Sequence, residues 1–208
     1  MSTQKKRSYD SASRLAKVAQ TRERILAVAK TLFAKHGIDN VTIDQLATGA
    51  EVSAPTVFAQ FQSKQGILRA LANDTLFDDR YETLVRKAQS ITEPVERLAV
   101  VAAIARNTYD VEKSKMGLLR GASAFSPELK ELEREGEQRR YHRQESTIRL
   151  FIDNHALAPG LDRARARDVL WALTSRDIYR MLVVEKGWSS DAYEQWLADT
   201  LRNALVKR

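Results

Sequence analysis

Three closely spaced helix-start signals constrain this chain more than any other feature of the sequence. Thr42, Ser53 and Ser63 each precede a short run with apolar side chains at helical spacing, and Gln45 completes a capping box with Thr42. Pro55 follows Ser53 in the first turn, where proline is tolerated. The signals leave room for helices of about two turns, which are unstable alone in water. The segment therefore predicts short helices that pack on one another.

The rest of the sequence also indicates helices. Only 8 Gly and 4 Pro interrupt 208 residues, whereas an all-β sandwich needs a turn every ~8–12 residues. A first helix is expected from about residues 16–21 to a stop at Gly37. The helices expected downstream of the three short starts cover about 64–87, 94–109, 112–121, 126–154, 162–186 and 190–206. We expect an all-α fold of about nine helices, with a soft spot at Gly136.

Charge is concentrated at the N-terminal end of the chain. Residues 1–70 hold 11 Lys+Arg and 5 Asp+Glu, a net charge of +6, whereas the remaining residues carry +1. A basic segment on a near-neutral body is typical of a phosphate-binding module, although it is also compatible with a solvated tail. We expect a disordered basic arm at residues 1–15, a DNA-binding domain at 16–66 and a helical body at 67–208.

The stretch from Leu46 to Phe58 has the spacing of a helix-turn-helix motif. Ala47 is the small residue at which two helices touch, and a tight turn follows around residues 50–52. Val57, ten positions after Ala47, is the apolar residue that anchors the second helix. In such motifs the N-terminal part of the second helix lies against base edges in the major groove.

At these residues the sequence resembles the TetR family of regulators. The motif elements run from Phe33 to Gly37, Thr42 to Ala47, Val52 to Phe58 and Phe61 to Lys64. The resemblance implies an N-terminal three-helix DNA-binding domain and a larger C-terminal helical domain that dimerises and binds a small molecule, with repression as the usual outcome. Glu51 stands where the family usually has Gly, and Phe58 stands where it often has Tyr.

The expected DNA contacts lie between residues 42 and 64. Their candidates are Thr42, Ser53, Ala54, Pro55, Thr56, Phe58, Gln60 and Lys64. Thr42 and Lys64 begin helices, where free amides attract phosphate, although both also fit a purely capping role. Thr56 and Gln60 offer groups for base edges, with solvent exposure or phosphate contact as the alternative.

Direct base reading by this segment is expected to be sparse, because Ala54 and Pro55 have no hydrogen-bonding side chain. We hypothesise that DNA shape contributes, together with a minor-groove contact by the basic arm. The basic residues of that arm are Lys5, Lys6, Arg7, Arg14 and Lys17.

Aromatic and apolar side chains mark the expected effector pocket and dimer interface. The pocket candidates are Phe77, Tyr81, Leu98, Tyr109, Met116, Phe125, Ile148 and Trp171, each of which also fits ordinary core. The interface candidates are Trp171, Tyr179, Leu182, Trp188, Trp196, Leu197 and Leu201, with packing inside one chain as the alternative. A twofold dimer predicts a pseudo-palindromic operator in double-stranded DNA.

Other classes of function have little support in the sequence. The absence of cysteine excludes disulfides, zinc–thiolate sites and cysteine nucleophiles, and it fits a reducing cytoplasm. His142 and Glu145 have a metal-ligand spacing, but two ligands do not make a site, so no metal or cofactor is expected. We expect neither a signal peptide nor a membrane span, and no catalytic motif indicates an enzyme. The alternative is an architectural DNA-binding protein without sequence preference.

Overall fold

The chain is helical throughout the part that the structure describes. The structure is a computed structural model that describes residues 3–76, 79–122 and 127–207. Within those ranges the regular elements are helices, and the only β pairing is an isolated antiparallel bridge between Leu157 and Val206. The expected all-α fold is confirmed. No helix in these ranges is long and apolar enough to cross a membrane.

The chain divides into two compact units. The N-terminal unit comprises Met1–Asn73 and Gly117–Leu132, and the C-terminal unit comprises Asp74–Met116 and Glu133–Arg208. The first boundary between the units therefore lies between residues 73 and 74, whereas we expected the DNA-binding domain to end at residue 66. Helix α4 (Lys64–Leu76) runs unbroken through residue 66, so the chain has no linker at that point.

The N-terminal unit begins with a long helix instead of a disordered arm. Helix α1 (Thr3–His36) starts at Thr3, whereas we expected a disordered arm over residues 1–15. The chain has no Gly or Pro before Gly37, and nothing local ends the helix earlier. Gly37 then takes a φ of 78°, which favours glycine, and ends α1 as expected.

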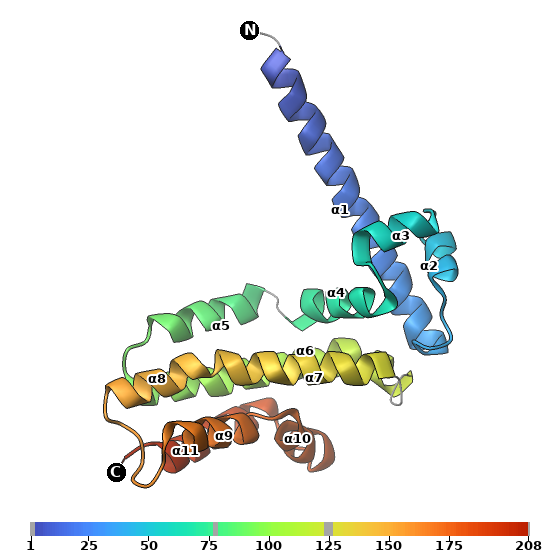
Figure 1. Cartoon of the computed structure of the whole chain (residues 1–208). Helices are drawn as coiled ribbons and strands as arrows, with labels where there is room; N and C mark the ends of the chain where they lie inside the picture. Colours follow the sequence, from blue (N-terminus) through green and yellow to red (C-terminus); the bar gives the residue numbers. More distant parts are fainter. Residues whose placement is uncertain (1–2, 77–78, 123–126, 208) are drawn as a thin grey trace. The chain divides into compact units, whose positions relative to one another are not determined.

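Helices α2 (Ile43–Gly49) and α3 (Ala54–Phe61) pack beside the C-terminal half of α1, as Figure 1 shows. Their apolar faces meet those of α1 and α4 in one core. Its buried side chains include Ile25, Ala29, Phe33, Leu46, Ala47, Val57, Phe61, Ile67 and Leu68. This packing supplies the stability that two-turn helices lack on their own.

The C-terminal unit is built from eight helical segments within the described residues. They are α5 (Asp79–Ser90), α6 (Pro94–Ala122), α7 (Pro127–Arg143), α8 (Glu145–Asp153), α9 (Arg163–Leu173), α10 (Arg176–Tyr179), the π-helix η1 (Arg180–Glu185) and α11 (Ser190–Leu205), of which α6 and α7 begin or end in the other unit. Asp162 and Ser189 cap α9 and α11 through their side chains.

Three helix boundaries in this unit differ from the prediction. Helix α6 is continuous where we expected two helices, and the helix expected to run over 126–154 breaks at Gln144, while Gly136 lies inside α7. The helix expected over 162–186 ends at Thr174. Gln144 Nε2 donates to Thr174 Oγ1 at 2.8 Å, so the two unexpected breaks contact each other. A long-range contact of this kind overrides local propensity.

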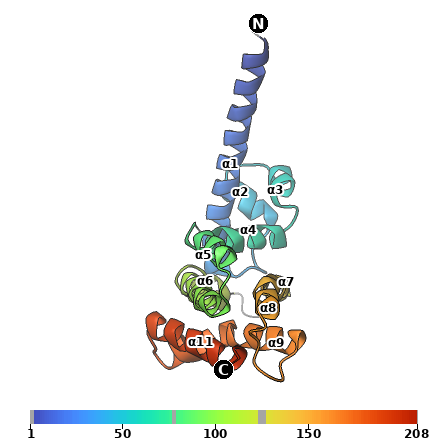
Figure 2. The same ribbon diagram turned by 90° about the vertical axis from the view of Figure 1, so that its left-hand side faces the viewer.

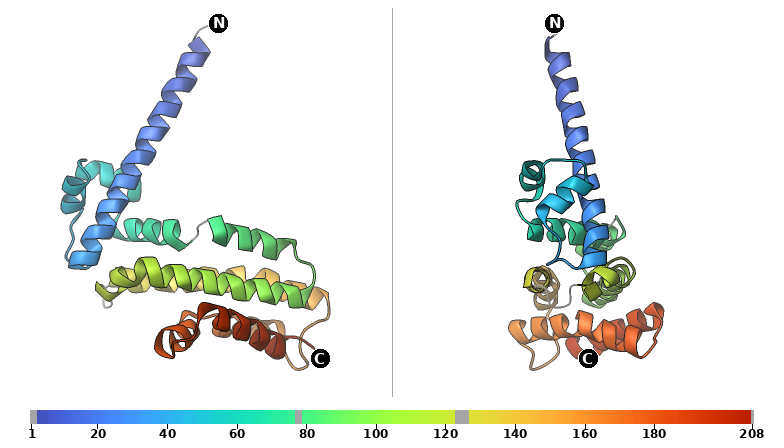
Figure 3. Two further views of the ribbon diagram at one scale, coloured as in Figure 1. Left: turned by 180° about the vertical axis from the view of Figure 1, so that it is seen from behind. Right: turned by 90° about the vertical axis from the view of Figure 1, so that its right-hand side faces the viewer.

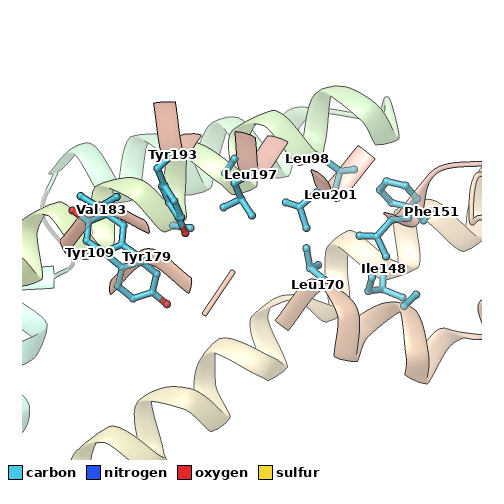
Figure 4. Packing of buried hydrophobic residues seen from close by; sticks show 14 residues of the cluster. Leu98, Tyr109, Ile148, Phe151, Leu170, Tyr179, Val183, Tyr193, Leu197 and Leu201 are labelled. Carbon is cyan, nitrogen blue, oxygen red and sulfur yellow. The ribbon is translucent and has the colours of Figure 1, made fainter. Parts of the chain in front are cut away.

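The core of the C-terminal unit lies between two layers of helices. Figure 2 shows α6 and α8 side by side, with α9 and α11 across from them. Figure 4 shows the buried side chains that these helices direct at one another, among them Leu98, Phe151, Leu170, Tyr193 and Leu197.

Candidate DNA-binding site

The start of α2 is fixed by the capping box that the sequence predicted. The Gln45 amide donates to Thr42 Oγ1 at 3.2 Å, and the Thr42 amide donates to Gln45 Oε1 at 2.8 Å. Thr42 is exposed, but its backbone amide and hydroxyl already take part in the cap.

A tight turn joins α2 to α3. The Ala50 and Val52 amides donate to the carbonyls of Leu46 and Ala47, both at 3.0 Å. Glu51 takes a φ of 53°, so this turn adopts the left-handed conformation that glycine favours. A non-glycine residue there costs about 1 kcal/mol. Glu51, which stands where the resembled family usually has Gly, is therefore a strained residue in this turn.

Close packing of α1 on α2 requires glycine at position 49. A Cβ atom added to Gly49 would lie 2.7 Å from Val28 Cγ1, which is closer than a Cβ atom approaches another carbon in folded proteins. Ala47 and Val57 are both buried, as the helix-turn-helix spacing predicted. The close approach of α1 and α2 therefore depends on the absence of a side chain at position 49.

The first turn of α3 is held by a pair of hydroxyl groups. The Thr56 amide donates to Ser53 Oγ at 3.3 Å, and Ser53 Oγ lies 2.8 Å from Thr56 Oγ1. Pro55 occupies the first turn, where its missing N–H has no cost. The Thr56 hydroxyl is thus engaged within the protein.

The outward face of α3 includes two of the residues that we expected there and two that we did not. Pro55, Phe58 and Ala59 are exposed, with Phe58 52% exposed, and Gln62 is exposed just after the helix. These positions have the spacing of one helix face. Gln60, the expected base-reading amide, is only half-exposed. Sequence reasoning missed Ala59 and Gln62, although counting three and four residues from Pro55 and Phe58 finds them.

Lys64 is directed at the protein. Its ammonium donates to the Ile38 carbonyl at 2.9 Å and lies 3.5 Å from the Asp39 carbonyl. It therefore ties the start of α4 to the loop after α1, which differs from the phosphate contact expected for this residue. Ser63 Oγ accepts from the Gly66 amide at 3.1 Å, which confirms the predicted cap.

The junction of α3 and α4 leaves no room for a side chain at Gly66. A Cβ atom there would lie 1.9 Å from the Phe61 carbonyl oxygen. Gln62, between the two helices, has a φ of 64°. Because α4 must approach the end of α3 this closely, Gly66 fixes how α3 is presented.

The effector candidates do not form one group. Leu98, Tyr109 and Ile148 are packed together in the core of the C-terminal unit, whereas Tyr81 is buried on α5 and Trp171 is exposed. The side chains of Phe77, Met116 and Phe125 lie outside the described residues.

Polar groups inside the C-terminal unit converge on Thr174. Tyr109 Oη donates to the Thr174 carbonyl at 2.9 Å, and Arg140 Nη1 donates to Thr174 Oγ1 at 2.8 Å. Nearby, Tyr193 Oη and Gln144 Oε1 are buried without a hydrogen-bond partner in the protein. Burial raises the pKa of Tyr109 and of Tyr193, so both phenols stay neutral at physiological pH. Of these residues the sequence analysis had selected only Tyr109, since tertiary contacts bring the others to it.

The expected interface residues separate into core and surface. Tyr179, Leu197 and Leu201 are buried inside the chain itself, so they have no surface to offer a partner. Leu182 and Trp196 are half-buried, while Trp171 and Trp188 are exposed. Met181 and Val184 on η1, which we did not predict, are exposed as well.

His36 lies in the last turn of α1, as expected for a cation near a helix C-terminus. It also lines an open groove of about 870 Å³ between α1 and α2. Residues 3–76, 79–122 and 127–207 contain no group of three or more potential metal ligands.

Comparison with known proteins agrees with this geometry. Residues 25–71 match the family of bacterial regulatory proteins, tetR family. NalD, the secondary repressor of the MexAB-OprM multidrug efflux pump in Pseudomonas aeruginosa, has a TM-score of 0.68 at 22% identity, over 92% of this chain and 98% of that one. No curated protein is similar enough in sequence to count as a relative.

Two further solved structures are similar over most of both chains. A transcriptional regulator from Saccharomonospora viridis in complex with choline has a TM-score of 0.62 at 25% identity, over 91% of this chain and 100% of that one. SmeT, a repressor of a Stenotrophomonas maltophilia efflux pump, in complex with triclosan has a TM-score of 0.66 at 19% identity, over 90% and 92%. Residues 25–71, which include the helix-turn-helix of α2 and α3, are therefore similar to bacterial regulatory proteins of the tetR family, and most of the chain has the fold of these solved regulators.

Proposed function

We propose that this regulator is a repressor that binds a pseudo-palindromic operator as a homodimer and releases it when a small molecule binds. The observation that carries the proposal is the exposed outer face of α3, held outward by the buried contacts of Ala47 and Val57. The major groove is about 12 Å wide and admits one helix. A helix presented in this way by a helix-turn-helix is suited to that groove.

The chemistry of α3 favours apolar reading of thymine. Pro55, Phe58 and Ala59 offer carbon atoms, and the C5-methyl group of thymine is the apolar feature of the major groove. Gln62 is the amide on this face that can bond to a base edge, while Gln60 is half-exposed beside it. Ala54, Ser53 and Thr56 lie at the start of the helix, where the groove wall and its phosphates are closest.

Phosphate contacts then position the domain without reading sequence. Thr42 and Ser53 are exposed at the starts of α2 and α3, where the helix dipole favours an anion. Lys64 contributes indirectly, because its ammonium holds the loop that precedes Thr42.

The dimer interface is proposed on the apolar surface around η1. Met181, Val184 and Trp188 are exposed close together in sequence, and Val184 is 53% exposed. The Trp188 ring lies edge-on to Trp196, with 6.1 Å between ring centroids. Exposed aromatic and Met side chains are enriched in interface cores. A second copy of the chain covers this surface by twofold symmetry.

The effector is proposed to bind in the C-terminal unit. Structural relatives bind choline and triclosan, which supports a small organic effector here. The unpaired Tyr193 hydroxyl and Gln144 carbonyl oxygen supply a donor and an acceptor for such a molecule. Binding shifts the population towards a conformation in which the two α3 helices are wrongly spaced for DNA.

Asp110 provides a route from α6 to the proposed interface. Its carboxylate accepts hydrogen bonds from Tyr179 Oη at 2.5 Å and from Ser190 Oγ at 2.6 Å. Arg106 Nε donates to the same carboxylate at 3.3 Å. A movement of α6 is therefore transmitted directly to α10 and α11.

Selection of duplexes from a random pool, followed by titration at physiological salt, tests the proposal. We expect a palindromic consensus bound at least roughly 10³-fold more tightly than scrambled DNA. Comparable affinity for both duplexes would favour an architectural DNA-binding protein instead.

The effector experiment uses choline, triclosan and a panel of similar compounds. A compound that raises the melting temperature must also release the consensus duplex, and one that stabilises the protein without release contradicts the switching mechanism.

A further inference from the structure

The first part of α1 extends away from the core of the N-terminal unit. Residues 13–20 are all exposed, and Ile25 is the first buried side chain on α1 within the described residues. Arg22 marks the edge of the core, since its guanidinium lies 4.9 Å from the centre of the Phe61 ring. Residues 3–24, which we call the helical arm, span about 33 Å at 1.5 Å per residue. Figure 3 shows this arm projecting past α2 and α3 in both views.

The helical arm carries most of the excess charge of its unit. It holds seven Lys and Arg and two Asp and Glu residues, a net charge of +5. Arg14, Lys17 and Arg24 are exposed and are separated by three and seven residues, which places them on one face of the helix. The arm and α3 belong to the same compact unit, so this basic face and α3 lie on one folded body.

The helical state decides which part of DNA the arm can contact. A helix with side chains is about 10–12 Å wide, whereas the minor groove is about 6 Å wide. The minor-groove contact expected of a disordered arm is therefore excluded for a helix. The major groove of each half-site accommodates α3, so the arm must lie outside that groove.

We infer that the helical arm is a second DNA-binding surface, which lies along the phosphate backbone next to the half-site that α3 occupies. Duplex DNA carries one negative charge per about 1.7 Å of axis, and a row of basic side chains on a helix complements it. The arm is the first part of α1, so the packed second half of the same helix holds its base beside α3. The inference rests on the proposed function, since it extends the operator contact made by α3.

The helical arm also has two exposed apolar side chains, which would suit a protein partner better than DNA. Leu15 is 69% exposed and Val18 is 45% exposed. Two apolar side chains are a small surface beside a net charge of +5, so charge complementarity favours DNA over a protein partner. Association between proteins through Leu15 and Val18 is treated as an outcome of the test.

The test compares the salt dependence of operator binding among three full-length proteins. The arm variant carries Arg14→Gln, Lys17→Gln and Arg24→Gln, because glutamine keeps the helix propensity. The control variant removes three exposed charges from the C-terminal unit, away from the surface around η1, with Lys87→Gln, Arg149→Gln and Lys207→Gln. Each protein is titrated with the selected duplex in two lengths, one ending at the half-sites and one longer by about one helical turn, or roughly 10 base pairs, at each end.

Wild type and control are expected to prefer the longer duplex and to share one slope of log K against log salt concentration. Every phosphate that the protein neutralises adds about 0.9 to the slope, so the arm variant should show a slope shallower by at least about 2 and no preference for length. An unchanged slope and length preference in the arm variant would overturn the inference. A Leu15→Ser/Val18→Ser variant tests the alternative. If this variant loses self-association but binds DNA normally, and if the arm variant also binds DNA normally, the arm makes protein contacts and the inference is wrong. If wild type itself shows no operator preference, the proposed function fails independently of the arm.

Discussion

Ser53 Oγ lies 2.8 Å from Thr56 Oγ1 and also accepts a hydrogen bond from the Thr56 amide, so one serine organises the first turn of α3. Replacing Ser53 by Ala should lower the free energy of unfolding by about 1 kcal/mol, because the variant has no N-cap side chain. Ser53→Asn should restore most of it, since asparagine is an equally good cap. Urea denaturation measures both, and equal stability of wild type and Ser53→Ala would refute this role.

The Lys64 ammonium is predicted to act on the fold and not on DNA phosphate. Lys64→Met removes its hydrogen bond to the Ile38 carbonyl and should cost about 1–2 kcal/mol of stability. At a temperature where the variant is fully folded, its salt slope for operator binding should equal that of wild type. A slope smaller by about 0.9 would instead show that Lys64 contacts a phosphate.

The strain at Glu51 predicts a stabilising substitution. Glu51→Gly should raise the free energy of unfolding by about 1 kcal/mol, because glycine tolerates the φ of 53°. Glu51→Ala removes the same carboxylate but keeps the strain, so it should leave stability nearly unchanged. Chemical denaturation of the pair separates backbone strain from charge, and equal stability of the two variants would argue against strain.

Two glycines should respond to alanine in opposite directions. Gly66→Ala forces a Cβ atom to within 1.9 Å of the Phe61 carbonyl oxygen, so it should cost at least about 2 kcal/mol. Gly136, inside α7, has nothing within 4 Å of the same position. Gly136→Ala should therefore gain about 0.5–1 kcal/mol from helix propensity. Thermal unfolding measures both, and a tolerated Gly66→Ala would contradict the close junction of α3 and α4.

Removing the hydroxyl group from two buried tyrosines of the C-terminal unit should also have different effects on stability. Tyr109→Phe leaves the Thr174 carbonyl without the donor at 2.9 Å, and it should cost about 1 kcal/mol. Tyr193→Phe removes a hydroxyl that has no partner in the protein, so it should be neutral or stabilising. It should also reduce the rise in melting temperature caused by an effector. A full effector response in Tyr193→Phe would remove this hydroxyl from the proposed site.

Local signals predicted much of the DNA-binding unit. The caps at Thr42, Ser53 and Ser63, and the buried pair Ala47 and Val57, depend on residues close together in sequence, and all of them were confirmed. The length of α1 was not predicted, because its polar first half has the composition of a disordered segment, although no residue before Gly37 ends a helix.

Features that depend on distant contacts could not be predicted. The break at Gln144 and the end of α9 at Thr174 lie at two residues that are 30 positions apart and share a hydrogen bond. The π-helix η1 has no sequence signal that we recognised. Leu197 and Leu201 are buried whereas Trp196 is half-buried, because only one face of α11 meets the other layer, and an apolar residue alone does not reveal which face that is.

The most direct test of the central claim is operator affinity after thymine is replaced by deoxyuridine in the selected half-sites. The change removes only the C5-methyl group and keeps every hydrogen-bonding group of the base. If the outer face of α3 reads thymine by apolar contact, each contacted methyl group contributes about 0.8 kcal/mol, or roughly fourfold in Kd. Wild type should bind the uracil duplex more weakly by this factor for each contacted position, and Phe58→Ala should show a smaller difference between the two duplexes. Equal affinity of wild type for both duplexes would contradict the reading of DNA by Pro55, Phe58 and Ala59.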